Sequence, residues 1–223
     1  FEENVRYFPS LLPELSDEDP IHELSEGRTP KLAELRLHNG TIYRWNRPVD
    51  EVVRGRPHMR IENRVLPAGP SVPDSVANAA LYYGMLHGLV SQARPYIWER
   101  MSFAAATDNF YAAARDGLGA RLYWPQIGAH VPVSELILRH LIPLAREGLQ
   151  DWGVDEGDID YYLGIIEERT LSGRSGAGWQ IETWRRLVDG AGLDRSEAAR
   201  ELVRRYHQRS FASTPVHTWP VSG

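Results

Sequence analysis

The hydrophobic pattern of the chain changes at about residue 70, and this change limits the folds that the chain can adopt. Before residue 70, apolar and polar residues alternate with a period of two in residues 33–45 and 58–65, which favours strands. From residue 71 onward, long segments have helical periodicity, and Ser71, Pro73 and Asp74 form a capping-box pattern before the first one. The sequence therefore predicts an α+β protein, with a sheet in residues 1–70 and a mainly helical region in residues 71–223.

The helical region contains five further segments with helical patterns. They read "SFAAATDNFYAAARDG", "SELILRHLIPLAREGL", "DEGDIDYYLGIIEER", "GWQIETWRRLVDGAG" and "DRSEAARELVRRYHQR". Pro143, in the second of these, is expected to kink or divide its helix. Asp194 and Glu197 form another capping-box pattern. The final residues, "STPVHTWPVSG", are expected to form an irregular tail.

Two segments of the first 70 residues are predicted to be strands of one antiparallel sheet. Residues 33–45 read "AELRLHNGTIYRW", in which Asn39-Gly40 separates two alternating stretches, a strong signal for a two-residue hairpin turn. Residues 58–65 alternate as well, with Met59 and Ile61 on the apolar face. We expect this apolar face to pack on a core and the polar face to line a concave surface. The stretch between the two segments, including Asp50 and Glu51, is expected to be a connection.

The polar face of residues 58–65 carries an unusual row of charges, formed by His58, Arg60, Glu62 and Arg64. One interpretation is a solvated strand face with arginine–glutamate pairs along it or across to a neighbouring strand. The other is a polyphosphate and metal site, because arginines match phosphate and carboxylate oxygens in a fork geometry and a carboxylate can hold Mg²⁺. The local pattern is compatible with both interpretations.

Composition and missing motifs exclude several classes of function. The formal net charge is -5 and no segment concentrates basic residues without nearby acids, so no nucleic-acid partner is indicated. The chain has no cysteine, which excludes disulfides and thiolate metal sites. The absence of a signal peptide and of an apolar run of about 18 residues predicts a cytoplasmic protein without a membrane partner. P-loop, dinucleotide-binding, zinc-protease and nucleophile-elbow motifs are also missing.

Four ordered segments carry a family resemblance. They read "RLHNGTIYRWNRPV", "RIENRVLPAGP", "ANAALYYGML" and "TLSGRSGAGWQ". Together they resemble the carboxy-terminal half of bacterial glutamate-cysteine ligases of the ATP-dependent carboxylate-amine ligase type, across nearly all 223 residues. The R-x-E-x-R element is also similar to one in glutamine synthetases. The resemblance implies a glutamine-synthetase-like fold, in which a curved antiparallel sheet binds ATP, divalent metal ions and an acidic amino acid on its concave face.

The chemistry that this resemblance implies fits the residue types. ATP would phosphorylate the γ-carboxylate of glutamate, and the amine of cysteine would then displace phosphate from the γ-glutamyl phosphate. Phosphoryl transfer depends chiefly on positioning and charge stabilisation, with ATP and Mg²⁺ or Mn²⁺ as the implied cofactors. Arginines and a metal ion can provide this without a covalent enzyme nucleophile. Ligation to an amine other than that of cysteine is a near alternative.

The resemblance also implies roles for individual residues. Glu62 would be a metal ligand, while Arg60 and Arg64 would be catalytic residues that neutralise phosphate oxygens or the acyl phosphate. The implied substrate or nucleotide neighbours are His38, Asn39, Tyr43, Trp45, Arg174, Trp179 and Gln180. Structural roles are the alternative for several of these: turn geometry for Asn39, core packing for Trp45 and Trp179, and helix capping for Gln180.

Two further expectations concern completeness. On the polar face of the predicted sheet only Glu34 and Glu62 are carboxylates, which is too few for the metal ions of an ATP site. The chain is therefore expected to be the carboxy-terminal portion of one catalytic domain, completed by an upstream segment or a partner chain. A non-catalytic relative that keeps the sheet and helices for assembly or ligand sensing is the remaining alternative.

Overall fold

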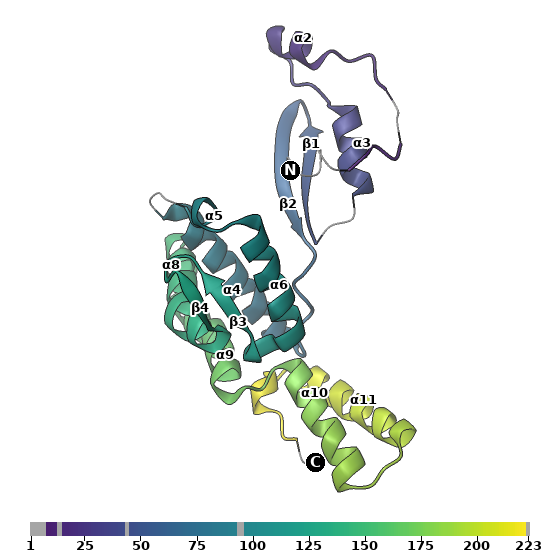
Figure 1. The fold of residues 1–223 in the computed structure, drawn as a ribbon, viewed down its shortest axis with the longest axis vertical. Coiled ribbons are helices and arrows are strands. Elements are labelled where there is room, and N and C mark those ends of the chain that lie inside the picture. Colours follow the sequence, from purple (N-terminus) through teal and green to yellow (C-terminus); the bar gives the residue numbers. More distant parts are fainter. Residues whose placement is uncertain (1–7, 13–14, 43–44, 93–95, 222–223) are drawn as a thin grey trace. The chain divides into compact units, whose positions relative to one another are not determined.

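The computed structural model describes residues 8–12, 15–42, 45–92 and 96–221. They belong to two compact units, Phe1–Pro67 and Ala68–Gly223, and the boundary lies near the predicted change of pattern at residue 70 (Figure 1). Helices occur together with two small antiparallel sheets, each of two strands, which confirms the predicted α+β class.

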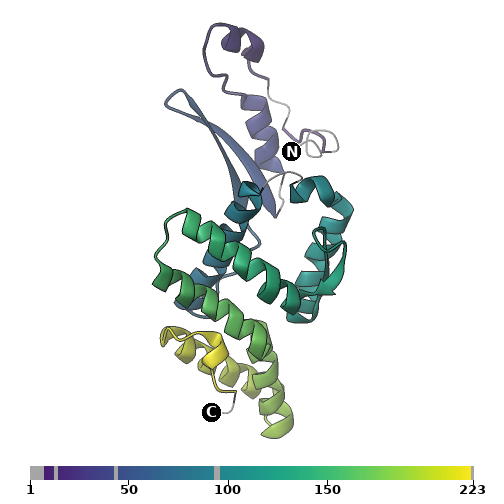
Figure 2. The same cartoon turned by 90° about the vertical axis from the view of Figure 1, so that its left-hand side faces the viewer.

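The first unit is built around a β-hairpin. Strand β1 (Asn46–Val53) pairs with β2 (Arg56–Asn63) through a two-residue turn. Both turn residues have positive φ, 52° at Arg54 and 76° at Gly55, as a type I′ turn requires. Helix α3 (Ala33–Thr41) lies beside β1 (Figure 2), and the short helix α2 (Pro20–Ser25) precedes it.

The prediction of a hairpin around Asn39-Gly40 was wrong, because Ala33–Thr41 is helical. Most of this segment consists of residues that also form helices well, and the amide of Asn39 is used in packing rather than in a turn. Asn39 is 3% exposed, and its Nδ2 donates to Asp50 Oδ1 over 3.2 Å. Asp50 and Glu51 lie within β1 rather than in a connection, so the hairpin turn comes 15 residues later than predicted.

The prediction for residues 58–65 was correct for most of its length, because β2 covers Arg56–Asn63. The expected packing of its apolar face on a core was wrong for this unit. Met59 is 74% exposed and Ile61 is 63% exposed. A two-stranded sheet with one helix beside β1 has too few elements to cover both of its faces.

The second unit is centred on three packed helices, α4 (Val72–Ser91), α8 (Ile142–Asp151) and α9 (Glu156–Ser172). Their buried apolar side chains include Ala145, Leu149, Ile159 and Leu163. Gly84 and Gly148 allow α4 and α8 to approach closely, because a Cβ on Gly148 would clash with the Gly84 carbonyl oxygen. The tight helix contact therefore depends on glycine at this crossing.

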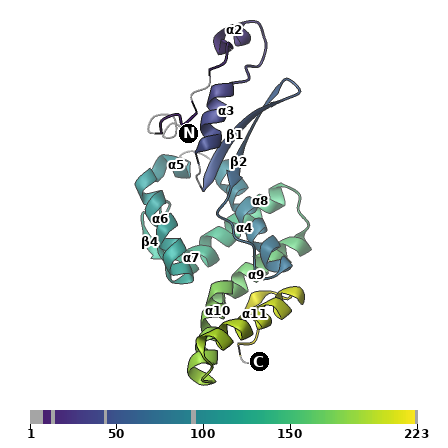
Figure 3. The same cartoon turned by 90° about the vertical axis from the view of Figure 1, so that its right-hand side faces the viewer.

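A smaller layer precedes α8 in the chain and was not fully predicted. After α5 (Ile97–Arg100), helix α6 (Phe103–Asp116) packs beside the hairpin of β3 (Arg121–Trp124) and β4 (Ala129–Pro132), as Figure 3 shows. Asn109 of α6 joins the two elements, because its Nδ2 donates to Tyr123 O and its Oδ1 accepts from Tyr123 N. The α6 helix was predicted, whereas the β3–β4 hairpin was missed.

The predicted helices of the second unit are confirmed with changes at their ends. The segment containing Pro143 is divided into α7 (Val133–Leu136), a π-helical turn at Ile137–Leu141, and α8. The last two helices are α10 (Gly176–Arg185), followed by a π-helical turn at Arg186–Gly190, and α11 (Arg195–Phe211).

The two predicted capping boxes differ in outcome. At α11, Asp194 caps the helix and its own N–H donates to Glu197 Oε2, so this box is confirmed. At α4, Ser71 caps the helix as predicted, but Asp74 does not complete the box. The Asp74 carboxylate instead accepts hydrogen bonds from the Ser71 hydroxyl and from the backbone N–H of Val216.

Candidate functional site

The pairing of β1 with β2 creates one charged face on the hairpin. The register places Arg47 opposite Glu62, Val49 opposite Arg60 and Glu51 opposite His58. Directly opposed residues of an antiparallel pair point to the same side of the sheet, so β1 adds its own charges to those of β2. The R-x-E-x-R row is therefore half of a two-stranded charged surface.

Glu62 lies between two arginines on this surface. Its Oε2 contacts Arg47 Nη2 at 2.8 Å and Arg64 Nη2 at 2.9 Å. The hydrogen bond from Arg64 lowers the pKa of the Glu62 carboxyl, and the positive charges of Arg47 and Arg64 lower it further. One carboxylate faces two guanidinium groups, so this cluster has a net positive charge of about one unit.

Arg60 makes a separate cross-strand pair at the more exposed part of the face. Its Nη1 contacts Glu51 Oε2 at 3.0 Å. This hydrogen bond and the charge of Arg60 lower the pKa of the Glu51 carboxyl, and the charge of Arg36 has a smaller effect in the same direction. Arg60 and Glu51 neutralise each other, so the excess positive charge lies around Glu62.

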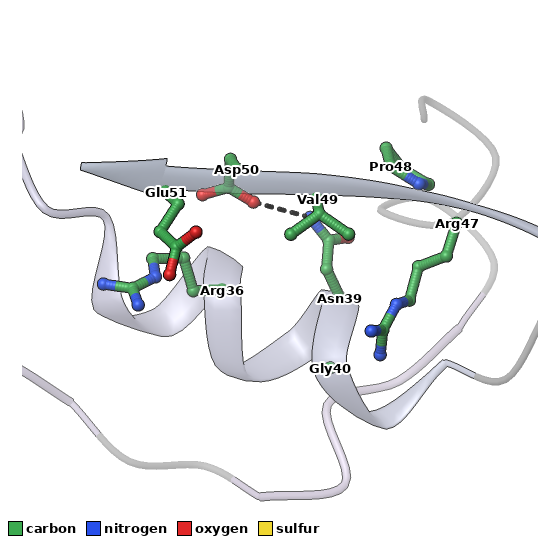
Figure 4. Close-up of a pocket in the computed structure, with 8 residues that line it drawn as sticks. All are labelled: Arg36, Asn39, Gly40, Arg47, Pro48, Val49, Asp50 and Glu51. Atoms are coloured by element: carbon green, nitrogen blue, oxygen red, sulfur yellow. Dashed lines mark hydrogen bonds between the residues drawn. The ribbon is translucent and has the colours of Figure 1, made fainter. Parts of the chain in front are cut away.

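A hollow of about 210 Å³ lies between α3 and β1 (Figure 4). Arg36, Asn39 and Gly40 of α3 form one wall, and residues 47–51 form the other. The hydrogen bond from Asn39 to Asp50 crosses between the two walls. Two buried polar atoms at these walls, Asn39 Oδ1 and Arg47 Nε, have no hydrogen-bond partner in the described part of the chain.

The structure brings some of the predicted site residues together in the first unit. Arg60 and Glu62 lie on the same face of β2, and Arg64 follows the strand with its N–H donating to Trp45 O. Asn39 lies at the hollow beside β1, whereas His38 is in the last turn of α3. More than half of Trp45 is exposed, so its expected alternative role in core packing is wrong. Tyr43 lies outside the described residues.

The other three predicted residues belong to the second unit. Arg174 Nη1 donates to the backbone oxygens of His217 and Trp219, at 3.3 and 3.2 Å. Trp179 is fully buried, and its Nε1 donates to Pro220 O, which confirms the alternative interpretation as a core residue. Gln180 lies within α10 and lines a hollow beside α11, so it does not cap the helix.

Sequence reasoning did not place three charged residues at the site: Arg47, which contacts Glu62, and Glu51 and Arg36, which lie near each other beside β1. Arg47 and Glu51 fall four positions apart in an alternating segment, so they share a face once the segment is recognised as a strand. The signal that could have identified this strand is Arg54-Gly55, a less common type I′ turn sequence than Asn-Gly. Arg36 could be placed only after α3 was known to be helical.

The residues of the charged face do not form a metal site on their own. Within the described ranges, no group of three or more histidine, aspartate or glutamate side chains is arranged to hold a metal ion. Glu62, the predicted metal ligand, has one oxygen in contact with two cationic side chains. Mg²⁺ takes about six oxygen ligands, so this carboxylate alone does not fit the requirement.

Comparisons with protein-family models, curated proteins and solved structures give no significant match for this chain. Among the described helices, none has the length and apolar character needed to cross a membrane. Three arginines and two carboxylates on neighbouring strands can bind an oxyanion if the arginines exchange an internal carboxylate partner for the ligand.

Proposed function

We propose that this chain is part of an ATP-dependent carboxylate-amine ligase that joins the γ-carboxylate of glutamate to the amine of cysteine through a γ-glutamyl phosphate. The observation that carries the proposal is the cluster in which Arg47 and Arg64 share Glu62 Oε2. In this proposal the charged face of the β1–β2 hairpin binds the phosphates of ATP and the acyl phosphate.

Charge balance supports this role for the arginines. A phosphate or acyl-phosphate oxygen can replace Glu62 as the partner of Arg47 or Arg64, because the cluster has one positive charge in excess. Guanidinium groups bind such oxygens through two parallel N–H groups, and this geometry suits a reaction catalysed by positioning and charge. Arg60 reaches the same face and can exchange Glu51 for an anionic ligand in the same way.

The proposal includes Mg²⁺ or Mn²⁺ as a cofactor, with ligands that the described residues do not supply alone. Glu62 would become available to a cation only when its arginines turn to phosphate oxygens. The remaining ligands, and the other strands of a curved glutamine-synthetase-like sheet, would come from an upstream segment or a partner chain. The exposed positions of Met59 and Ile61 support this, because more strands or helices would cover them.

A second candidate function is non-catalytic assembly or ligand sensing. The observation that favours it is that Arg60, Glu62 and Arg64 all have charged partners within the hairpin, as expected for a solvated strand face. In that case the apolar side of β2 would serve as an assembly surface. Ligation with a different acceptor amine is a variant of the first proposal rather than a separate class.

The test is glutamate-dependent ADP release by the full-length protein, screened over cysteine and other amines. The proposal predicts turnover with at least one amine, and a loss of at least about 100-fold on Glu62→Gln, which keeps the shape and removes the charge. Arg56→Ala is the matched control, because Arg56 is an exposed charge at the far end of β2. Turnover that survives Glu62→Gln would refute the assigned site. No glutamate-dependent turnover with any amine would favour the non-catalytic function.

A further inference from the structure

The last described residues of the second unit pack as part of its core. We call residues 214–221 the C-terminal strap; apart from a 3₁₀ turn at Val216–Thr218, it has no regular structure. Val216, Trp219 and Val221 are buried in one cluster with Trp179 of α10. Trp179 and Trp219 meet edge to face, with ring centroids 5.2 Å apart. The expected irregular tail is therefore irregular in its backbone but firmly packed in its side chains.

Polar contacts attach the strap to three other parts of the unit. The fully buried Asp74, at the start of α4, accepts from Val216 N over 3.0 Å. Arg174, in the link between α9 and α10, donates to two strap carbonyl oxygens. Trp179 of α10 donates to a third. Backbone groups of the strap are thus bound by side chains from α4, from the link between α9 and α10, and from α10.

The 3₁₀ turn of the strap lies against α9, and the end of the strap runs beside α10, as Figure 1 shows. One group of helices has its core in α4, α8 and α9, and a second group has its core in α10, α11 and the strap. Helix α9 packs against the strap's 3₁₀ turn more extensively than against α10 or α11. A close approach of Gly176 to Pro70 is a further contact at this junction. Much of the attachment between the two groups therefore runs through the strap.

We propose that the C-terminal strap is a latch that fixes α10 and α11 to the α4–α8–α9 group, and that α10 and α11 separate as one body when it is released. Incomplete hydrogen bonding favours release. His217 Nδ1 is buried and has no hydrogen-bond partner in the described part of the unit. Asp74 Oδ1 also lacks a hydrogen bond there and has only the charge of Arg169 nearby, with Arg169 Nη1 at 3.7 Å. Buried polar atoms without a hydrogen bond reduce the stability of the closed state relative to an open state in which water reaches them. Arg174 positions the latch, because it holds the backbone oxygens of His217 and Trp219.

The test is hydrogen–deuterium exchange of the full chain, compared with Arg174→Ala and Val216→Pro. Val216 begins the 3₁₀ turn after Pro215, a position that accepts proline, so this substitution removes the N–H that binds Asp74. Each variant is expected to accelerate exchange in α10 and α11 by about tenfold, the effect of losing roughly one net hydrogen bond. Exchange in α4, α8 and α9 should remain unchanged. Arg185→Ala, an exposed arginine on α10, is the matched control.

Two outcomes would overturn the latch. If exchange in α4, α8 and α9 rises together with that in α10 and α11, the unit opens as a single core. If neither variant changes exchange in α10 and α11 more than Arg185→Ala does, the strap does not fix the pair. Cleavage at residues 172–176 by a protease that does not require arginine provides a second readout and should be faster in both variants. The inference concerns the second unit alone and does not depend on the proposed ligase activity.

Discussion

Arg47 and Glu62 lie directly opposite each other on β1 and β2, with Arg47 Nη2 2.8 Å from Glu62 Oε2. This contact is one of the causes that hold the pKa of the Glu62 carboxyl below its ordinary value of 4.5. Arg47→Met keeps a long side chain and removes the charge, so it should raise the pKa of Glu62 toward 4.5. An NMR titration of the Glu62 carboxyl carbon measures this, and an unchanged pKa would show that the pair does not persist in solution.

Arg64→Lys should weaken anion binding by the charged face. A lysine ammonium provides a point charge but not the two parallel N–H donors of a guanidinium. We expect the affinity of the full-length protein for ATP to fall by about tenfold, consistent with the loss of one charge-assisted hydrogen bond. Isothermal titration calorimetry with ATP measures this change, and Arg56→Lys serves as control. Equal ATP affinity in wild type and Arg64→Lys would place Arg64 outside the binding site.

His217 should make the second unit less stable in mild acid. Burial lowers the pKa of its imidazole below 6.5, while Glu168 and Asp74 partly oppose this and Arg169 and Arg174 add to it. The unfolded chain therefore binds the proton more readily than the folded chain does. The free energy of unfolding should be highest above about pH 6.5 and decrease as the pH falls toward the lower folded pKa.

Urea unfolding between pH 7.5 and pH 5.5 tests this prediction. His217→Asn should reduce the loss of stability over this interval, because asparagine does not titrate. His130→Asn, at an exposed position of β4, is the control and should follow the wild-type pH profile. A His217→Asn profile parallel to that of the wild type would contradict the assignment of the effect to His217.

Gly148→Ala should destabilise the second unit. The added Cβ would clash with the backbone carbonyl of Gly84, and backbone atoms cannot turn away as a flexible side chain can. We expect a loss of about 1–3 kcal/mol in the free energy of unfolding, typical of overpacking in a tight interior. Gly164→Ala is the matched control, because a Cβ at that position in α9 meets open space. It should be neutral or slightly stabilising, since alanine favours helix more than glycine does.

The sequence predicted the helices of the second unit better than the strands of the first, and two dipeptides explain much of the difference. Asn39-Gly40 is the stronger hairpin signal, yet it lies in α3, where Asn39 bonds to Asp50. Arg54-Gly55 makes the turn instead, with Arg54 in a left-handed conformation that arginine rarely adopts. Local preference was overruled by contacts between α3 and β1, which a single sequence does not reveal.

The candidate site was also only partly predictable from the sequence. The alternation around Arg60, Glu62 and Arg64 was sufficient to place these residues along one side of a strand and its continuation. It could not supply Arg47 as the second partner of Glu62, because that contact depends on the β1–β2 register. The spacing of Asp74 to Ser71 predicted a capping box, which Asp74 does not complete, and its bond to Val216 depends on packing between distant parts of the chain.

The bond between Asp74 and Val216 joins residues 142 positions apart in the chain, and this separation determines the order in which the second unit can be completed during synthesis. Helices α4, α8 and α9 can pack as soon as α9 has left the ribosome, because their mutual contacts need no later segment. Helices α10 and α11 emerge next but lack Trp219, which meets the rings of both Trp179 and Tyr206 edge to face. Their docking must wait for Trp219, so the newly made chain passes through a stage in which this aromatic surface is open to water and to chaperones.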